Sequence, residues 1–374
     1  MSKNKITNIE AIMLLVLISL THIILSLPKN IIVSLNSASI INLFFISIVA
    51  ILIVSIIVKL LNNFNSLDIL DISELVGGKI FKNIIGVIFI LYFIFTSSLL
   101  LRNFCETLKI VYYPMTNILF ILSLFVISIC YVNRLSLSAI LKTNIIIVPI
   151  AIFSILFLFF ANVKNFMPNK IFPLFGNGFY DTFILGFSNL SAFGGIAFLY
   201  FLPPFLADST KTKKISILSL LIISICLILS VSTLLFMFSI FETTSKISPL
   251  YSAARYIEFG KFFQRLESIF LLIWILLFAS YLSIITSVSL YILKKVLNLQ
   301  STNSIIDILG LAIFSISLFP ENYAISLSFE KNYYPFLVIL VVFLLSIGIL
   351  IIANFKKKGL NSWIHSLLNF LSLP

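Results

Sequence analysis

Long apolar runs are the feature that most restricts how this chain can fold. A helix needs about 20 mainly apolar residues to cross a bilayer, because a rise of about 1.5 Å per residue must cover roughly 30 Å of hydrocarbon. Uncharged or nearly uncharged runs of this kind follow one another along the whole chain, with short connections between them. They occupy residues 9–35, 38–58, 84–101, 117–132, 143–161, 182–206, 215–241, 268–293, 304–319 and 334–353.

The composition also favours a membrane location. Of the 374 residues, 60% are hydrophobic and only 10% are charged, whereas soluble domains carry about 25% charged residues. The runs are apolar throughout and do not alternate with polar residues, which favours helices over the strands of a β-barrel. We therefore predict an all-α integral membrane protein with about ten transmembrane helices, folded as one domain over residues 1–374. Residues 355–374 are expected to form a cytoplasmic tail.

Lysine and arginine indicate the orientation, because cytoplasmic loops carry an excess of both. If the N-terminus is inside, fifteen of the 25 basic residues fall on the inner side. An even number of helices then places both termini in the cytoplasm. The net charge of +12 follows from this topology, so these residues are expected to meet the lipid bilayer and no nucleic acid. The inner set is Lys3, Lys5, Lys59, Lys79, Lys82, Arg134, Lys142, Lys211, Lys213, Lys214, Lys294, Lys295, Lys356, Lys357 and Lys358.

Two segments between the runs are predicted to lie along the membrane surface. Residues 65–76 mix leucines with three acidic residues and stop at Gly77 and Gly78, which suit a helix end. Residues 248–265 contain aromatic and basic residues along their whole length, and this segment is expected to cover the outer mouth of the helical bundle.

Matched interruptions divide the ten runs into two sets of five. Transporter folds built from inverted repeats bind solutes near mid-membrane, where one helix in each repeat is broken. In the sixth run Gly194 and Gly195 precede a proline pair, and in the first run Thr21 and His22 precede Pro28 at similar spacing. We predict repeats over about 8–162 and 182–354, with breaks in helices 1 and 6. The alternative is that these glycines and prolines only allow close helix packing.

Polar residues inside the runs identify a possible ligand cavity. His22 is the only histidine within a run; it either binds a carboxylate or a proton, or bonds a freed backbone carbonyl. The hydroxyl groups of runs 3 and 8 either line a cavity or bond their own helix. Together, runs 1, 3, 6 and 8 are expected to hold a small zwitterion. The candidate ligand-binding residues are Thr21, His22, Tyr92, Thr96, Phe193, Gly194, Gly195, Tyr281, Ser287 and Tyr291.

Sequence signatures of enzymes are missing. The chain contains no G-x-S-x-G, no H-E-x-x-H, no Walker loop and no cluster of cysteine with histidine. We therefore expect no catalytic residues, no metal and no cofactor.

Two stretches resemble the endospore germination permeases. Residues 78–114 begin with Gly-Lys and lead through an apolar run to Arg102, Phe104 and Pro114, followed by Thr116. Residues 258–274 resemble the Phe-x-Arg-Leu-acid element that precedes a tryptophan in helix 8 of that family. In this chain the element consists of Phe263, Arg265, Leu266, Glu267 and Trp274.

The resemblance implies a fold of the amino acid-polyamine-organocation superfamily and a role as the B subunit of a nutrient germinant receptor. It also implies a location in the spore inner membrane, together with a membrane-embedded A subunit and a lipoprotein C subunit. The implied ligand is a small nutrient such as an amino acid. The same fold also suits an ion-coupled amino-acid transporter or a gated conduit for water or ions, so these alternatives stay open.

Overall fold

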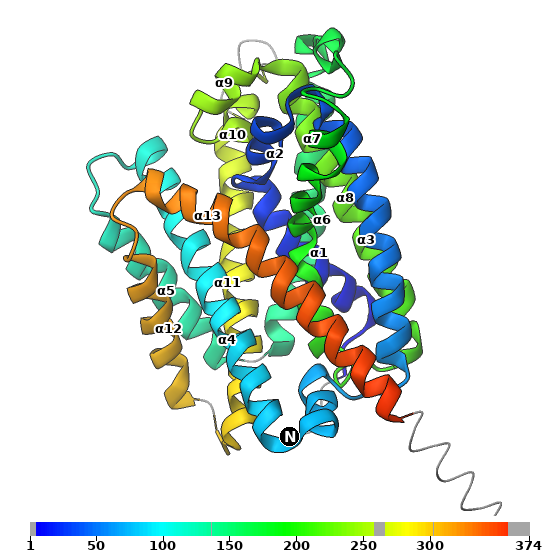
Figure 1. Ribbon diagram of the computed structural model, residues 1–374. Helices are drawn as coiled ribbons and strands as arrows, with labels where there is room; N and C mark the ends of the chain where they lie inside the picture. The colour runs from blue at the N-terminus through cyan, green and yellow to red at the C-terminus, as the bar shows by residue number, and fades with distance from the viewer. Residues whose placement is uncertain (1–4, 136, 258–265, 302, 358–374) are drawn as a thin grey trace, which may run out of the picture.

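The computed structural model describes residues 5–135, 137–257, 266–301 and 303–357 (Figure 1). Within these ranges the secondary structure is helical, apart from turns and one isolated bridge between Ile6 and Leu206. This confirms the predicted all-helical class.

The helices follow one another in the order that the apolar runs predict. Nine belong to the first part of the chain: α1 (Asn8–Ile24), α2 (Leu27–Leu35), α3 (Ser39–Asn62), α4 (Ile69–Tyr112), α5 (Ile118–Arg134), α6 (Leu137–Ala161), α7 (Phe179–Phe183), the 3₁₀ helix η4 (Leu185–Phe201) and α8 (Thr212–Met237). The remaining ones are α9 (Ile240–Ser245), α10 (Pro249–Arg255), α11 (Glu267–Leu297), α12 (Asn303–Ser317), α13 (Tyr323–Leu337) and the π-helix η6 (Val338–Leu345). Short 3₁₀ turns occupy Asn36–Ala38, Val163–Asn165, Pro168–Ile171 and Ser209–Lys211.

Seven continuous helical segments of the described chain are long and apolar enough to cross a membrane. Three more apolar helices, α1, α5 and α12, are only 15 to 17 residues long. The outward face of α3 shows why lipid is the expected surroundings. Phe44, Ile48, Leu52 and Ile56 recur every fourth residue, and each is more than half exposed. An apolar stripe of this kind is stable against hydrocarbon and not against water.

Helix α1 lies in the middle of the bundle, in contact with α6, α8, α11 and η4 (Figure 1). Most of its residues are buried, including His22. Helices α5 and α12 form one edge of the molecule, and the continuous helix from α13 through η6 crosses the bundle obliquely. The centre of the protein is therefore built around the first helix of the chain.

A short helix precedes the long part of α4, as the sequence predicts. The Asp68 side chain caps it by accepting hydrogen bonds from the backbone N–H groups of Leu70 and Asp71. The helical path is interrupted at Gly77 and Gly78, and Gly78 has a φ of 74°, which favours glycine. The short helix therefore covers residues 69–76, within the predicted 65–76.

The break in the first apolar run lies beyond the predicted position at Thr21 and His22. Helix α1 continues through both residues to Ile24, and α2 begins at Leu27. The cause is Pro28, which has no N–H and whose ring clashes with the carbonyl group four residues earlier, at Ile24. The helix ends where that clash begins, so Thr21 and His22 form its last buried turn.

The sixth run is distorted over its whole length and not only at its glycines. All of η4 is a 3₁₀ helix, and Phe193 within it has non-helical angles of φ −96° and ψ 20°. Runs of 3₁₀ helix longer than three or four residues are uncommon, because their hydrogen bonds are poorly aligned. The sequence predicts an irregular helix here, but its extent was missed.

A π-helix in the last apolar run packs against η4, and the sequence did not predict it. The Tyr200 hydroxyl of η4 donates to the backbone oxygen of Val342 at 2.7 Å, and Ser346 Oγ donates to the oxygen of Val341 at 2.8 Å. Side chains therefore supply hydrogen bonds to the carbonyl groups of the widened turns. Two irregular helices stabilise each other at this contact.

We expect Tyr200→Phe to lower the stability of the purified protein by about 1 kcal/mol, because one buried hydrogen bond is lost while the ring remains. Thermal unfolding in detergent measures the change. Ser128→Ala is the matched control, because the exposed Ser128 hydroxyl bonds only its own helix at Leu124. Equal melting temperatures for both variants would contradict a stabilising role for the Tyr200 contact.

Candidate functional site

His22 lies between two tyrosines in the interior of the bundle. Its ring stacks on Tyr334 of α13 with centroids 4.6 Å apart, and meets the edge of Tyr281 of α11 at 5.8 Å. The Tyr334 hydroxyl is 3.3 Å from His22 Nε2 and 3.4 Å from the backbone oxygen of Ser191 in η4. One tyrosine thus connects the last turn of α1 with the distorted helix η4.

Gly194 allows η4 to approach this tyrosine. A Cβ atom at Gly194 would lie 2.7 Å from the Tyr334 hydroxyl and 3.1 Å from Val338 Cγ2. Phe193, next to it, is completely buried. The glycine therefore lies against Tyr334, which stacks on His22.

Helix α4 completes the site. Tyr92 and Thr96 are buried, and both interact with the hydroxyl of Tyr281. The Thr96 hydroxyl itself donates to the backbone oxygen of Tyr92 at 2.9 Å. We call this group of side chains the central cluster; it consists of His22, Tyr92, Thr96, Gly194, Tyr281 and Tyr334.

Two other predicted residues are close to the cluster but have structural contacts. The Thr21 hydroxyl donates to the backbone oxygen of Leu17 in its own helix at 2.9 Å. A Cβ atom at Gly195 would lie 2.9 Å from Ser19 Oγ and 3.2 Å from the Leu15 oxygen. Gly195 thus brings α1 and η4 together, which is the close-packing alternative.

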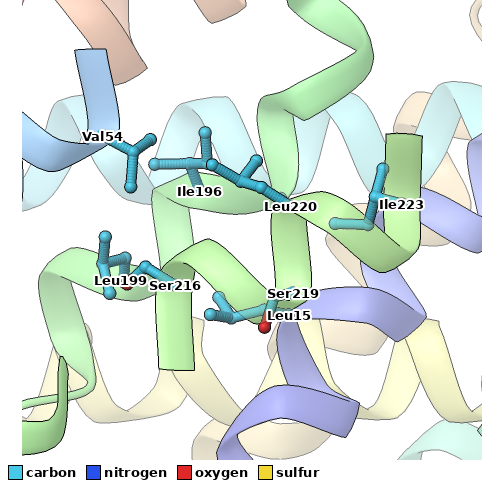
Figure 2. A pocket seen from close by; sticks show the side chains of 9 residues that line it. Leu15, Val54, Ile196, Leu199, Ser216, Ser219, Leu220 and Ile223 are labelled. Carbon is cyan, nitrogen blue, oxygen red and sulfur yellow. The ribbon is translucent and has the colours of Figure 1, made fainter. Parts of the chain in front are cut away.

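Gly195 also lines a small pocket between α1, α3, η4 and α8 (Figure 2). The walls of this small pocket are mainly aliphatic, with Val54, Leu220 and Ile223 among them. The hydroxyl groups of Ser216 and Ser219, which also line it, donate to their own helix. This pocket offers little to a zwitterion, so it is not a part of the candidate site.

The predicted residues Ser287 and Tyr291 have their hydrogen-bond partners away from the central cluster. Ser287 donates to Asn133 of α5 at 2.6 Å, and Tyr291 donates to Asp68 at 2.6 Å. Tyr291 follows Tyr281 by ten residues, which is about 15 Å along a helix. Around the helix, Ser287 and Tyr291 share a face of α11, but Tyr281 lies about 80° from Tyr291. These side chains are therefore not neighbours in one site.

Tyr291 belongs to a buried ionic group at the end of α11. Asp68 is fully buried and accepts hydrogen bonds from Tyr291 and from Lys295 at 2.7 Å, while Lys295 also pairs with Asp71 at 2.7 Å. The ring of Phe205 packs against Tyr291 at 5.0 Å. This group, the Asp68 cluster (Asp68, Asp71, Tyr291 and Lys295), fastens the short helix before Gly77 to α11.

Helix α13 contributes a face of the site that the sequence did not reveal. Ser326, Glu330 and Tyr334 are its buried residues, spaced every fourth position. That spacing is a helical signal, but Lys331 and Asn332 make the segment appear to be a polar loop. The buried face was therefore missed.

Glu330 is the buried acidic residue of this face. Its two carboxylate oxygens accept hydrogen bonds from Ser26 at the start of α2 and from the Asn103 side chain of α4. Only 5% of the residue is exposed. Glu330 thus directly contacts the break between α1 and α2.

The residues of the family resemblance also lie near this break. Arg102 is buried and pairs with Glu106 at 2.9 Å, and Phe104 packs on Phe278 of α11 with centroids 4.2 Å apart. Trp274 and Leu25 line a second small pocket. Phe263 and Arg265 lie outside the described residues, as does the end of the predicted outer segment 248–265, whose start forms α10.

Together, the all-helical bundle, the interrupted first helix and the buried polar cluster beside it are typical of a membrane permease or a receptor derived from one. Residues 5–325 match the spore permease family, described as spore germination protein. The chain belongs to this family, which confirms the resemblance read from its residues. It is also 27% identical to Spore germination protein A2 of Bacillus subtilis (strain 168) over 247 residues, covering 66% of this chain and 67% of that protein.

The family establishes a role in spore germination. It is a family of the permease type and not a class of enzyme. The long apolar helices agree with its location in a membrane.

Proposed function

We propose that this chain is the membrane subunit of a nutrient germinant receptor, the B subunit, and that it binds a small amino acid-like nutrient at the central cluster. The observation that carries the proposal is the position of His22 and Tyr334. They form a buried polar contact between the interrupted first helix, the distorted helix η4 and α13. Two of these elements, the interrupted first helix and η4, are irregular, which is the usual setting of a solute site in this kind of fold.

The helix ends beside the cluster suit a zwitterion. Helix α1 ends at Ile24, where its last carbonyl groups carry partial negative charge, and α2 begins at Leu27 with the opposite polarity. An ammonium group is favoured at the first end and a carboxylate group at the second. Phe193, Tyr92 and Tyr281 would then surround the side chain of the nutrient.

We further propose ten crossings in two inverted repeats, over about 8–162 and 182–354, with both termini in the cytoplasm. Contacts at the ends of the helices support this arrangement, because basic residues of the predicted inner set lie at one end of the helical bundle. Lys295 pairs with Asp68, Arg134 pairs with Asp307, and Lys356 donates to Leu75. The proposed tail, 355–374, lies outside the described residues beyond Lys357.

The proposed partners are an A subunit embedded in the membrane and a lipoprotein C subunit, all in the spore inner membrane. Membership in the germination family supports this assembly. Co-purification of the tagged chain from spore membranes, followed by mass spectrometry, tests it. The two subunits should accompany the chain in comparable amounts.

Germination of a deletion strain in response to individual nutrients tests the receptor function. We expect spores without this chain to lose the response to one nutrient, and the wild-type gene to restore it. A His22→Leu gene should not restore it, because leucine keeps volume but removes the polar contact with Tyr334. His365, outside the described residues, provides the matched control: His365→Leu should restore germination.

A transport function would give a different result. Robust uptake of a labelled amino acid into liposomes by the purified chain alone, driven by an imposed ion gradient, would assign transport as the primary function. An unchanged response of the deletion strain to every nutrient would contradict the receptor function directly.

A further inference from the structure

Glu330 is a buried carboxyl group whose hydrogen-bond partners are uncharged. Ser26, Asn103 and Glu330 meet where α2, α4 and α13 come together. No ion pair among the described residues involves Glu330. Because an isolated carboxylate is costly to bury away from water, such a group is stable mainly when it carries a proton or a cation.

Both partners of Glu330 can serve either protonation state. When the carboxyl group is ionised, the Ser26 hydroxyl and the Asn103 amide N–H donate to it. When it is protonated, its O–H group can donate to Ser26 Oγ or to an amide oxygen, since hydroxyl and amide groups are both donors and acceptors. Asn103 Oδ1 is buried and has no hydrogen-bond partner among the described residues. Rotation of that amide would present this oxygen to the protonated acid.

The titratable groups around Glu330 do not neutralise it. Tyr281 of α11 and Tyr323 and Tyr334 of α13 interact with it electrostatically, and all three are phenols. His22 of α1 stacks on one of these tyrosines, Tyr334. On α4, Arg102 and Glu106 are paired with each other at 2.9 Å.

We propose that Glu330 is a proton-binding site and that its proton is linked to the geometry of the α1–α2 break through Ser26. Binding takes one proton from water, and release returns it, with no other bond formed or broken. Ser26 is one of the two residues between the end of α1 and the start of α2. A change in its hydrogen bond with Glu330 therefore acts on the point where the first helix is interrupted. The link to nutrient binding rests on the proposed function, whereas the proton site itself does not.

Infrared difference spectroscopy of the full chain in lipid nanodiscs tests the proton site. We expect the C=O stretch of a buried protonated carboxyl group, which weakens as the pH is raised. Glu330→Gln should remove this band, because glutamine keeps the hydrogen bonds but binds no proton. Glu106→Gln is the matched control and should leave the band intact, because Glu106 is paired with Arg102 at 2.9 Å and Glu330 has no such cation among the described residues.

A wild-type spectrum without such a band, or a band that survives in Glu330→Gln, would overturn the proposal. In spores, the nutrient concentration for half-maximal germination should depend on pH in the wild type and lose that dependence in Glu330→Gln. If this nutrient concentration still depended on pH in Glu330→Gln spores, the proposed link between the proton and the α1–α2 break would be overturned. If no nutrient response required this chain, the receptor function would fail while the infrared result still decided the proton site.

Discussion

Spores carrying Gly194→Leu are expected to need at least about tenfold more nutrient for half-maximal germination, although the protein is present in the membrane. The first added carbon would lie 2.7 Å from the Tyr334 hydroxyl. Tyr334 cannot retreat easily, because its ring stacks on that of His22 with centroids 4.6 Å apart. A loss of about 1.4 kcal/mol in binding already corresponds to a tenfold change, and overpacking of a buried contact typically costs about 1–3 kcal/mol.

Gly348 provides the control for this experiment. A Cβ atom at Gly348, further along the helix that contains Tyr334, meets no atom within 4 Å. Spores carrying Gly348→Leu should therefore germinate normally. Immunoblots of spore membranes measure the amount of each variant. Normal nutrient sensitivity of Gly194→Leu at normal abundance would show that the central cluster is not the nutrient site.

Lys295→Met is expected to destabilise the purified protein by about 3–5 kcal/mol, the usual loss when one partner of a buried ion pair is removed. Asp68 is fully buried and Lys295 is 2.7 Å from it. Methionine keeps the length of the side chain but leaves Asp68 without a cation. Thermal or denaturant unfolding in detergent measures the loss, and proteolysis near Gly77 should increase as the short helix separates from α11.

An exposed ion pair separates the effect of burial from the effect of charge. Arg134 pairs with Asp307 at 2.6 Å, but both side chains are about half exposed, at 54% and 50%. Exposed pairs contribute roughly 0–1 kcal/mol, so Asp307→Asn should change stability little. Similar losses in Asp307→Asn and Lys295→Met would contradict the structural role of the Asp68 cluster.

The sequence was sufficient to predict features that depend on local chemistry. Apolar runs predicted the positions of the helices, and the glycine pair at 77 and 78 predicted the end of the short helix after Asp68. Residues such as His22 and Gly194 could be selected as candidates because a polar group or a double glycine is unusual inside an apolar run. These signals need no knowledge of how helices pack.

The rest depended on contacts between helices. Tyr334 reaches His22, and Glu330 reaches Ser26 and Asn103, across more than 200 residues of sequence. Spacing along α11 could not show that Tyr291 bonds Asp68, because this contact joins residues 223 positions apart. The predicted position of the break in the first helix was wrong. Pro28 disrupts the turn before it, at Ile24, and leaves Thr21 and His22 within the helix.

The oblique helix that begins at Tyr323 is continuous for 35 residues, to Lys357, or about 52 Å. Near its start it carries Glu330 and Tyr334, and at its other end Lys356 donates to the carbonyl groups of Leu75 and Val76, just before the glycine pair. This helix therefore joins the proposed nutrient site to the short helix before Gly77. A pivot of about 5° about its midpoint would displace each end by about 2 Å. A small tilt of this one helix would therefore move groups near both surfaces of the protein at the same time.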